Sequence, residues 1–463
     1  MMDTATAARA VAGRMVGGNV RFSRVTTDTR ALAAGDLFVA LKGEHFDGHD
    51  FVATAFERGA AAALVAEPRA AALPGNLIAV ADSLAALGRL AAFWRARFEL
   101  PVIVVVGSNG KTTVKEMIAS ILRMHFGEAA VLATRGNLNN AIGLPLTLLG
   151  LRDEHRVAAI ELGMNHPGET AELAAIAQPT VAVVNNAQRE HQEFMKSVAD
   201  VAAEHAALIR ALPAGGIAVI NADDASADLW RGAARERAGV SAIEFALDHP
   251  AAVRGRHVAA PTGAALELRT PAGDATVRLA VVGRHNAANA LAATTAALAI
   301  GIPLASVVRG LEAFRPVSGR LVARIAANGA TVIDDSYNAN PDSVRAAIDV
   351  LRAAPGAKWL VLGDMGEVGT EGPAFHREIG DYARDAGIDR LLTVGTLAAE
   401  SAAAFGRGAE HHAAMDALLA RIAADFAAPG GGAVTVLVKG SRFMRMERVV
   451  AALCGGTTAE GAH

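Results

Sequence analysis

The stretch from Val102 to Leu122 constrains the fold of this chain more than any other. Its apolar run Val102–Val106 predicts a buried strand, and the turn Gly107–Gly110 separates that strand from a helix that begins at Lys111. Such a unit binds anions, because free backbone N–H groups and the positive end of the helix dipole point at one spot. Lys111 would add a cation for terminal phosphates, and Thr112 a hydroxyl for Mg²⁺.

This loop departs from the common phosphate-loop pattern G-x-x-x-x-G-K-[ST]. Val105 stands where the first glycine belongs, so only the shorter G-x-x-G-K-T-T remains. The alternative is an ordinary strand–turn–helix with a surface lysine. The order of strand, turn and helix favours a phosphate loop, in which we expect Lys111 to be exposed at the helix start.

Composition sets the class of protein. A length of 463 residues predicts two to four domains, and the single Cys454 excludes an internal disulfide framework and a cysteine-based zinc site. A net charge of -3 gives no electrostatic footprint for nucleic acid. The N-terminus lacks a signal-peptide core, and no apolar run is long enough to span a bilayer. We expect a cytoplasmic protein that binds no nucleic acid and does not insert into a membrane.

Polar residues follow two further predicted strands. Glu161 ends the run Val157–Ile160, and His191 comes soon after the run Val181–Val184. Ligands of open parallel sheets bind beyond the carboxyl ends of the strands, where Lys111 would also lie. Alone, Glu161 could cap a helix and His191 could be a loop histidine. Together beside a phosphate loop, they are expected to bind Mg²⁺ directly or through water.

Three other groups of polar residues have structural explanations as well as functional ones. The residue types alone favour a capped surface turn at Thr27, Asp28 and Arg30. The asparagines that follow Thr134 are by default a turn-forming cluster, although ligand contacts would also explain them. Asn289, in the first turn of a predicted helix, is harder to explain as packing. The asparagines of the cluster after Thr134 are Asn137, Asn139 and Asn140.

The order of the predicted elements indicates an α/β fold with three domains, over residues 1–82, 83–314 and 315–463. Weakly alternating residues 241–282 predict antiparallel strands within the central domain. The last domain alternates strands and helices and is Rossmann-like, but it lacks GxGxxG after its first strand, so a dinucleotide site is unsupported.

Several motifs in order along nearly the whole chain resemble the Mur ligase family. They are GSNGKTT at 107–113, ELGM at 161–164, NNAQREH at 185–191, GRHNAANALAA at 283–293, SGR at 318–320 and DDSYNANPDS at 334–343. Further stretches look like the member that joins D-alanyl-D-alanine to UDP-N-acetylmuramoyl-tripeptide. These are DLFVALKGEHFDGHDF at 36–51, RGNLNNAIGLPLTLL at 135–149 and LGDMGEVG at 362–369.

The resemblance implies a fold and a reaction. A small α/β domain would bind the UDP-substrate, a central P-loop ATPase domain with a mainly parallel sheet would bind ATP and Mg²⁺, and a C-terminal Rossmann-like domain would complete the ligase. The tripeptide carboxylate would attack ATP to give an acyl phosphate and ADP, and the amine of D-alanyl-D-alanine would then displace phosphate. Such an enzyme serves cytoplasmic peptidoglycan precursor synthesis, and a monomer is expected.

The resemblance also implies roles for individual residues. Lys111, Glu161 and His191 would be catalytic, with Thr112, Glu161 and His191 serving Mg²⁺. The remaining roles concern nucleotide and substrate. ATP would contact Gly107, Ser108, Asn109, Gly110, Lys111, Thr112, Thr113, Asn289, Arg320 and Asp335, with adenine at Asn289 and ribose at Asp335; the UDP-substrate would contact Asn137, Asn139 and Asn140, and Thr27, Asp28 and Arg30 near the uridine. Asp364 and residues 439–442 are weaker candidates near the dipeptide.

Alternatives remain open. A sister Mur ligase that adds a single amino acid, or a folylpolyglutamate synthase-like enzyme, would share the ATPase core, although the uridine-type N-terminal domain argues against the folate enzyme. A nucleotide-dependent switch without ligase chemistry is the alternative outside the enzyme class, and the Glu161–His191 pair and Asp335 argue against it.

One departure from the family pattern yields a separate prediction. Several Mur ligases carry a carbamylated lysine in the helix after the His191 position, which by spacing falls here at His205. Lys196 is the only lysine between residues 115 and 358 and lies well before that position. Glu204 has the charge of a carbamate but points about 100° away on a helix, and His205 could simply pack on a helix face. We expect no carbamylated lysine, activity independent of bicarbonate, and any second Mg²⁺ held by substrate phosphate, water and His191.

Overall fold

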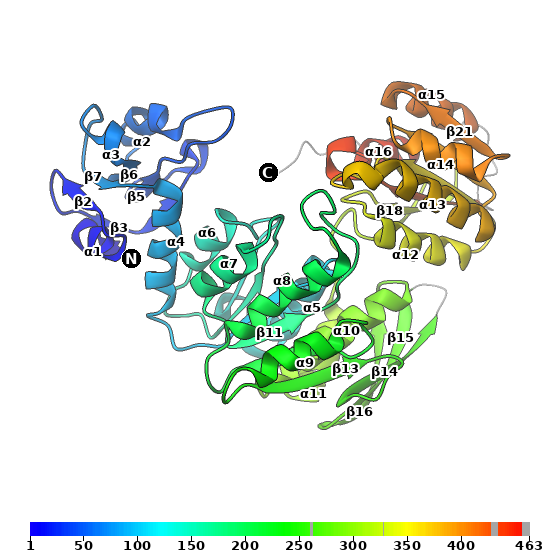
Figure 1. Ribbon diagram of the computed structural model, residues 1–463, viewed down its shortest axis with the longest axis horizontal. Helices are drawn as coiled ribbons and strands as arrows, with labels where there is room; N and C mark the ends of the chain where they lie inside the picture. Colours follow the sequence, from blue (N-terminus) through cyan, green and yellow to red (C-terminus); the bar gives the residue numbers. More distant parts are fainter. Residues whose placement is uncertain (260–262, 327, 427–433, 456–463) are drawn as a thin grey trace.

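The computed structural model describes residues 1–259, 263–326, 328–426 and 434–455, which form three α/β domains (Figure 1). In the view of Figure 1 the N-terminal domain, in blue, and the C-terminal domain, in yellow to red, stand on either side of the central domain. The predicted α/β class, with three domains and a mainly parallel sheet in the central one, is confirmed. None of the described helices combines the length and apolar character that crossing a bilayer requires.

The N-terminal domain is built on a sheet with the strand order β2-β7-β6-β5-β4. Strands β4 to β7 run parallel, and β2 pairs antiparallel with β7 at one edge. The elements are β1 (Met2–Asp3), α1 (Thr4–Ala10), β2 (Arg14–Val16), β3 (Arg21–Phe22), β4 (Arg24–Thr26), η1 (Thr29–Ala31), β5 (Asp36–Val39), η2 (Gly48–Phe51), α2 (Val52–Glu57), β6 (Ala62–Ala66), α3 (Glu67–Ala70) and β7 (Leu77–Val80).

The central domain carries a nine-stranded sheet in the order β16-β15-β14-β13-β12-β11-β8-β10-β9. Its elements are α4 (Ser83–Arg95), β8 (Val102–Val106), α5 (Lys111–Phe126), η3 (Glu128–Ala130), β9 (Val131–Ala133), α6 (Gly143–Leu148), β10 (Val157–Glu161), α7 (Glu169–Ala177), β11 (Val181–Val184), α8 (Val198–Arg210), β12 (Ile217–Asn221), α9 (Ala227–Arg235), β13 (Ser241–Ala246), β14 (Val253–Ala259), β15 (Ala264–Thr270), β16 (Gly273–Leu279), α10 (Arg284–Ala299) and α11 (Leu304–Ala313).

The antiparallel strands predicted for residues 241–282 are found only in part. β14, β15 and β16 pair antiparallel, but β13 runs parallel to both β12 and β14. The helix α9 connects β12 to β13, and such a crossover is what parallel neighbours require. The antiparallel hairpins therefore extend a parallel sheet instead of forming a separate one.

Strand β8 lies between β10 and β11 in this sheet. Its residues are all buried, and they alternate between two cores because successive strand side chains point to opposite faces. Val102, Val104 and Val106 pack with α4, α6, α7 and α8, while Ile103 and Val105 pack with α5, α10 and α11. The carboxyl ends of three adjacent parallel strands therefore meet at one edge, where Glu161 lies at one of these ends and Lys111 and His191 follow the other two.

The C-terminal domain is a six-stranded sheet in the order β17-β18-β22-β19-β20-β21, parallel except for the edge strand β17. The elements are β17 (Val322–Ile325), β18 (Thr331–Asp335), α12 (Pro341–Arg352), β19 (Ala357–Gly363), η4 (Gly369–Glu371), α13 (Gly372–Asp385), β20 (Arg390–Val394), α14 (Ala398–Phe405), β21 (Ala409–His412), α15 (Met415–Phe426), β22 (Val434–Lys439), η6 (Arg442–Met444) and α16 (Glu447–Cys454).

The two junctions between domains differ in chemistry. On the N-terminal side, α4 packs against α1 as well as α6 and α7, so one apolar core runs from the first domain into the second. On the C-terminal side the contacts are polar. The Arg189 side chain pairs with Asp342 and Glu378, at 2.6 Å each, and the side-chain amides of Asn109 and Asn340 pair with each other.

Candidate active site

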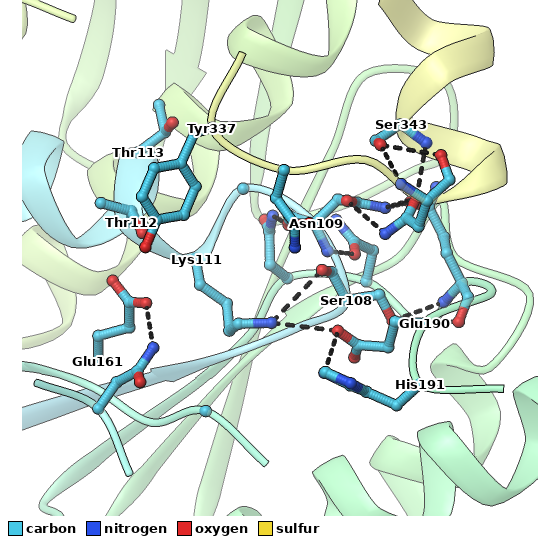
Figure 2. Close-up of a pocket in the computed structure, with 18 of the residues that line it drawn as sticks. Ser108, Asn109, Lys111, Thr112, Thr113, Glu161, Glu190, His191, Tyr337 and Ser343 are labelled. Carbon is cyan, nitrogen blue, oxygen red and sulfur yellow. Dashed lines mark hydrogen bonds and ion pairs between the residues drawn. The ribbon is translucent and has the colours of Figure 1, made fainter. Parts of the chain in front are cut away.

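A cavity of about 1270 Å³ lies where the central strands end, between the central and C-terminal domains. Most predicted site residues line it, and several are drawn in Figure 2. Gly107 does not line it directly, and Thr27, Asp28 and Arg30 of the N-terminal domain lie outside its lining. The predicted residues that line it are Ser108, Asn109, Gly110, Lys111, Thr112, Thr113, Asn137, Asn139, Asn140, Glu161, His191, Asn289, Arg320 and Asp335.

The asparagines after β11 hold the phosphate loop in place. Asn186 Oδ1 accepts from the Asn109 N–H at 2.8 Å, and Asn185 Nδ2 donates to the Asn109 carbonyl at 2.8 Å. Gly110 has φ of +82°, and a Cβ there would collide with the Asn289 side chain. Two features therefore require a glycine at position 110, namely the left-handed backbone and this close approach.

The sequence predicted that Lys111 is exposed, and the structure contradicts this prediction. Only 18% of its side chain is accessible, because the ammonium folds back over the loop. Its Nζ donates to the Gly107 carbonyl at 2.6 Å and lies 3.2 Å from Glu190 Oε2 (Figure 2). Burial on its own would raise the pKa of Glu190, but the charge of Lys111 and the contact with His205 outweigh burial and lower that pKa to about 2. Lys111 and Glu190 thus form an ion pair beside the loop.

Glu161 sits at the end of β10 with one carboxylate oxygen unused. It is 2% exposed, and its Oε1 accepts from Asn139 Nδ2 at 2.7 Å. Among the described residues, none forms a hydrogen bond with its buried Oε2. A buried carboxylate oxygen without a partner is costly, and a hard cation is the ligand that would satisfy it. With Thr112 at the start of α5 also lining the cavity, the residues present fit Mg²⁺.

His191 lies on the other side of Lys111 from Glu161, as Figure 2 shows. Its Nδ1 is 2.6 Å from Glu367 Oε2 of the C-terminal domain, and its Nε2 is 3.7 Å from Glu190 Oε2. Within the described parts of the chain, no three His, Cys, Asp or Glu side chains converge into a metal cage. Phosphate and water would therefore supply part of any Mg²⁺ shell, and the metal roles of Thr112, Glu161 and His191 stay predictions.

The residues predicted for the nucleoside come from two domains. Asn289 is buried, and its amide accepts from Asn185 Nδ2 at 2.9 Å and donates to Asn286 Oδ1 at 3.1 Å. The Arg320 guanidinium lies 4.3 Å from the centre of the Tyr337 ring. Asp335 accepts from Lys439 Nζ at 2.6 Å. The structure thus brings all three predicted residues to one cavity, with Asn289 and Asp335 already engaged by protein partners.

The residues predicted for the UDP-substrate are more scattered. Asn139 bonds to Glu161, and Asn140 Oδ1 accepts from the Ile142 and Gly143 N–H groups at the start of α6. Asp28 caps η1 and pairs with Arg30 at 2.7 Å, which is the capped surface turn that the residues alone favoured.

The weaker dipeptide candidates divide. The Asp364 carboxylate accepts from the N–H groups of Thr396 and Ala398 at the start of α14, and it does not line the cavity. Of residues 439–442, Lys439, Ser441 and Arg442 do line it.

Sequence reasoning missed several residues of the site. Glu190 is the buried partner of Lys111, and Arg189 links to the C-terminal domain. His285 also lines the cavity, where burial lowers its pKa to about 4 and keeps the imidazole neutral at pH 7. For Arg189 and Glu190 the available signal was the charged triplet Arg189–His191 in the loop that follows β11.

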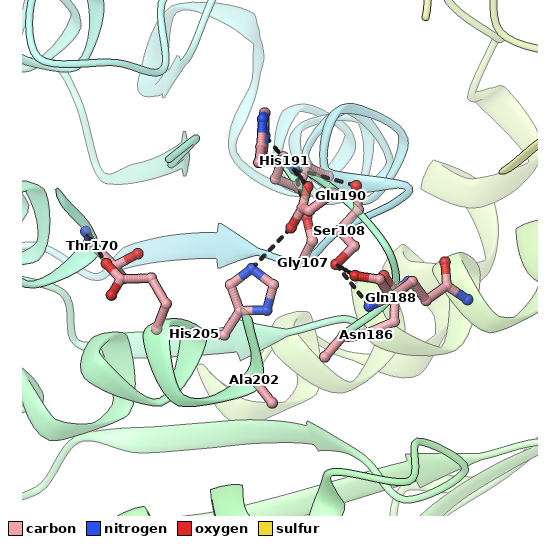
Figure 3. A network of polar contacts seen from close by, with 12 residues as sticks. Gly107, Ser108, Thr170, Asn186, Gln188, Glu190, His191, Ala202 and His205 are labelled. Atoms are coloured by element: carbon pink, nitrogen blue, oxygen red, sulfur yellow. Dashed lines mark hydrogen bonds and ion pairs between the residues drawn. The ribbon is translucent and has the colours of Figure 1, made fainter. Parts of the chain in front are cut away.

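The helix α8 places its two candidate residues in different directions. His205 is 1% exposed, and its Nε2 lies 3.3 Å from Glu190 Oε1 (Figure 3). Glu204 instead accepts from the N–H groups of Gly168 and Thr170 at the start of α7. His205 therefore does more than pack on a helix face, and Glu204 caps a helix.

The sequence matches three family domains in this order. They are the Mur ligase family catalytic domain over residues 21–95, the Mur ligase middle domain over residues 105–297 and the Mur ligase glutamate ligase domain over residues 319–442. The chain is 42% identical to the UDP-N-acetylmuramoyl-tripeptide–D-alanyl-D-alanine ligase of Escherichia coli (strain K12), covering 95% of this chain and 96% of that one.

Solved structures agree with this similarity. MurF from Acinetobacter baumannii is 34% identical and matches with a TM-score of 0.89 over 98% of both chains. The MurF ligase of Thermotoga maritima, solved in complex with ADP, is 27% identical and matches with a TM-score of 0.81 over 93% of this chain and 96% of that one. By its domains, its near full-length relatives and its fold, this chain belongs to the Mur ligase family.

Proposed function

We propose that this chain is the ATP-dependent, ADP-forming ligase that joins D-alanyl-D-alanine to UDP-N-acetylmuramoyl-tripeptide in peptidoglycan precursor synthesis. The observation that carries the proposal is similarity along nearly the whole chain to ligases of that name, 42% identical over 95% of the chain. The cavity supports it, because a phosphate loop, an unpartnered buried carboxylate and groups from a second domain face one space.

The chemistry follows from the difficulty of making an amide from a carboxylate. A carboxylate is a poor electrophile, and transfer of the ATP γ-phosphate to the tripeptide carboxylate provides a leaving group, with ADP released. The amine of D-alanyl-D-alanine then attacks the acyl carbon, and phosphate leaves. Bringing two anions together requires positive charge, which Lys111 and backbone N–H groups of the loop supply. Glu161 and Thr112 would hold Mg²⁺ on one side of Lys111 and His191 would serve it from the other, and the ion would supply positive charge to the phosphate oxygens.

The remaining residue roles are part of the same proposal. Gly107 to Thr113 bind phosphate, Asn289 faces adenine, and Arg320 and Asp335 reach the nucleotide from the C-terminal domain. Asn137, Asn139 and Asn140 face the UDP-sugar, and Thr27, Asp28 and Arg30 lie toward uridine. ATP would then draw the central and C-terminal domains together, since residues of both domains line the cavity.

We also propose the domain limits 1–82, 83–314 and 315–463, a monomer, and a cytoplasmic enzyme. Each of the three main sheets falls inside one of these ranges. Light scattering on the purified chain tests the monomer, because a dimer would double the measured mass.

The deciding experiment measures ADP release with each substrate omitted in turn. Turnover should need ATP, Mg²⁺, a UDP-N-acetylmuramoyl-tripeptide and D-alanyl-D-alanine together. Single amino acids in place of the dipeptide test the sister ligases, and folate with glutamate tests the folate enzyme. ADP release that needs neither acceptor would indicate a nucleotide switch and contradict the proposal. Tripeptides that differ in their third residue would then define the acceptor.

A further inference from the structure

We infer that His205 is a positioning residue for phosphate transfer, which acts through Glu190 on Lys111. The inference rests on the proposed ligase function, because it assigns Lys111 to phosphate transfer. It concerns a chain of three side chains from three elements: the start of α5, the loop after β11 and the middle of α8. Figure 3 shows Glu190 between the phosphate loop and His205.

Glu190 joins two groups that do not contact each other. Its Oε2 lies 3.2 Å from Lys111 Nζ. Its Oε1 lies 3.3 Å from His205 Nε2, an ion-pair distance at which the two atoms are not aligned as a hydrogen bond in this structure. The residue is 5% exposed, so water does little to fix the carboxylate. The orientation of Oε2, and with it the position of the ammonium, therefore depends on what holds Oε1.

His205 is the group that faces Oε1. It is 1% exposed on the buried face of α8, and its Nδ1 has no partner among the described residues. Its contact with Glu190 is thus the polar interaction that accounts for a histidine at this buried position. An imidazole needs no charge for this role, because a neutral ring with its proton on Nε2 donates to a carboxylate.

A correctly placed ammonium matters because misplacement by about 1 Å can cost roughly a hundredfold in rate. Without a donor at Oε1, the Glu190 carboxylate can rotate and draw Lys111 away from the incoming phosphate. His205 touches neither ATP nor acceptor in this arrangement, so its effect should appear in turnover and leave acceptor binding unchanged.

The test compares two substitutions of one residue. His205→Leu fills the space without a donor, whereas His205→Gln keeps an N–H that reaches the same region. We expect His205→Leu to lower kcat by about tenfold to a hundredfold, with the KM for D-alanyl-D-alanine changed by less than about threefold. His205→Gln should recover most of the lost turnover. Glu204→Gln, one position away on α8, is the matched control and should lower the unfolding temperature while kcat stays near wild type.

A double-mutant cycle decides whether His205 acts through Glu190. In a Glu190→Gln background, His205→Leu should cost less than about twofold further in kcat, because the group it positions is gone. An equal loss in both backgrounds would overturn the inference. So would a folded His205→Leu variant with wild-type kcat. If His205→Leu does not fold, His205→Asn takes its place in the cycle, since its shorter amide cannot reach Glu190.

Wild-type enzyme in the same assay separates this inference from the proposed function. If the wild-type enzyme turns over with D-alanyl-D-alanine and every His205 variant has the same kcat, the inference is refuted and the proposed function stands. Wild-type enzyme that releases no ADP with any acceptor refutes the proposed function, on which the inference rests.

Discussion

Two buried carboxylates flank Lys111, and they differ in what surrounds them. Glu161, at the end of β10, shares one oxygen with the Asn139 amide and keeps the other without a partner among the described residues. Glu190, in the loop after β11, has the Lys111 ammonium 3.2 Å from one oxygen and the His205 imidazole 3.3 Å from the other. The second oxygen also lacks an aligned hydrogen bond within the described parts of the chain, so the two carboxylates differ in the ion-pair partners beside them. We call these two regions the Glu161 side and the Glu190 side of Lys111. Among the described residues the Glu161 carboxylate has no cationic partner, whereas the Glu190 carboxylate is paired with Lys111.

This difference separates two tasks that the residue type alone does not distinguish. A carboxylate with an unused buried oxygen is suited to take a cation from solution. A carboxylate already paired with a lysine serves as that lysine's counter-ion, and it would have to lose the pair to bind a metal. We therefore propose metal binding for the Glu161 side and control of Lys111 for the Glu190 side, and variants on each side test this proposal.

The largest effect is expected for Lys111→Ala, which removes the group between the two sides. Turnover should fall by about a thousandfold or more, because the phosphate loop loses the ammonium that stabilises the transferred phosphate. Stability should fall as well, by about 3 kcal/mol, because Glu190 is left buried without its cation. ADP release and thermal unfolding measure the two effects.

A second substitution separates them. Lys111→Ala combined with Glu190→Gln should regain stability, since no buried charge remains, while turnover stays low. Near-normal turnover in Lys111→Ala would contradict the phosphate-loop assignment. Equal instability in the single and double variants would show that Glu190 is not the counter-ion.

The next effect is expected on the open side. Glu161→Gln keeps the shape of the side chain but removes the charge, so kcat should fall by about a hundredfold and more Mg²⁺ should be needed for half-maximal rate. Stability should be unchanged or slightly higher, because the unpaired buried charge is gone. A Mg²⁺ titration of ADP release and a thermal melt measure both. A drop in stability like that of Lys111→Ala would remove the contrast between the two carboxylates.

A smaller effect is expected at the junction next to the Glu190 side. Arg189→Gln should raise the KM for ATP by about fivefold while leaving UDP-substrate affinity unchanged, because it removes the pairs with Asp342 and Glu378 that hold the C-terminal domain. Small-angle scattering should show a broader distribution of domain positions. An unchanged KM for ATP would show that this contact has no part in nucleotide use.

The same contact has a defined pH dependence. The hydrogen bond from Arg189 is the largest cause of a lowered pKa at Glu378, and it outweighs burial. A lowered carboxyl pKa means that the pairing stabilises the folded protein above the ordinary value of about 4.5 and is lost as pH falls through the lowered value. Scattering at neutral pH therefore reports the paired junction.

The last prediction is that bicarbonate has no effect on turnover. Bicarbonate added to depleted buffer should leave turnover unchanged, because the position of the family lysine holds His205. The nearby Lys196 is exposed and lies before α8. An anionic carbamate at the place of the imidazole would also face the Glu190 carboxylate, and like charges at that distance repel. A clear increase in rate on adding bicarbonate would contradict this prediction.

The sequence predicts one side of the site better than the other. Strand Val102–Val106, the helix start at Lys111 and the place of Glu161 at a strand end all follow from local patterns, and the structure confirms them. The role of Glu190 does not follow, because its partner His205 lies fifteen residues along the chain on a helix whose buried face is set by packing. For the same reason Lys111 was expected to be exposed.

Contacts between domains were the least predictable part. Asn340 caps α12 in a capping box with Ser343, which local sequence can indicate. Its pairing with Asn109, 231 residues away, depends on how the C-terminal domain sits. Arg189 likewise carries no local sign of its partners. A resemblance between motifs indicates which residues share a site, but not which of them hold one another.

The strand order of the central sheet has a consequence for how this enzyme can evolve. The Glu161 side follows β10 and the Glu190 side follows β11, and β8 separates the two strands. Changes after one strand can therefore accumulate without moving the residues after the other. Across relatives, substitutions at Glu190 and His205 should occur together, as should those at Glu161 and Asn139, while the two pairs vary independently around an invariant Lys111.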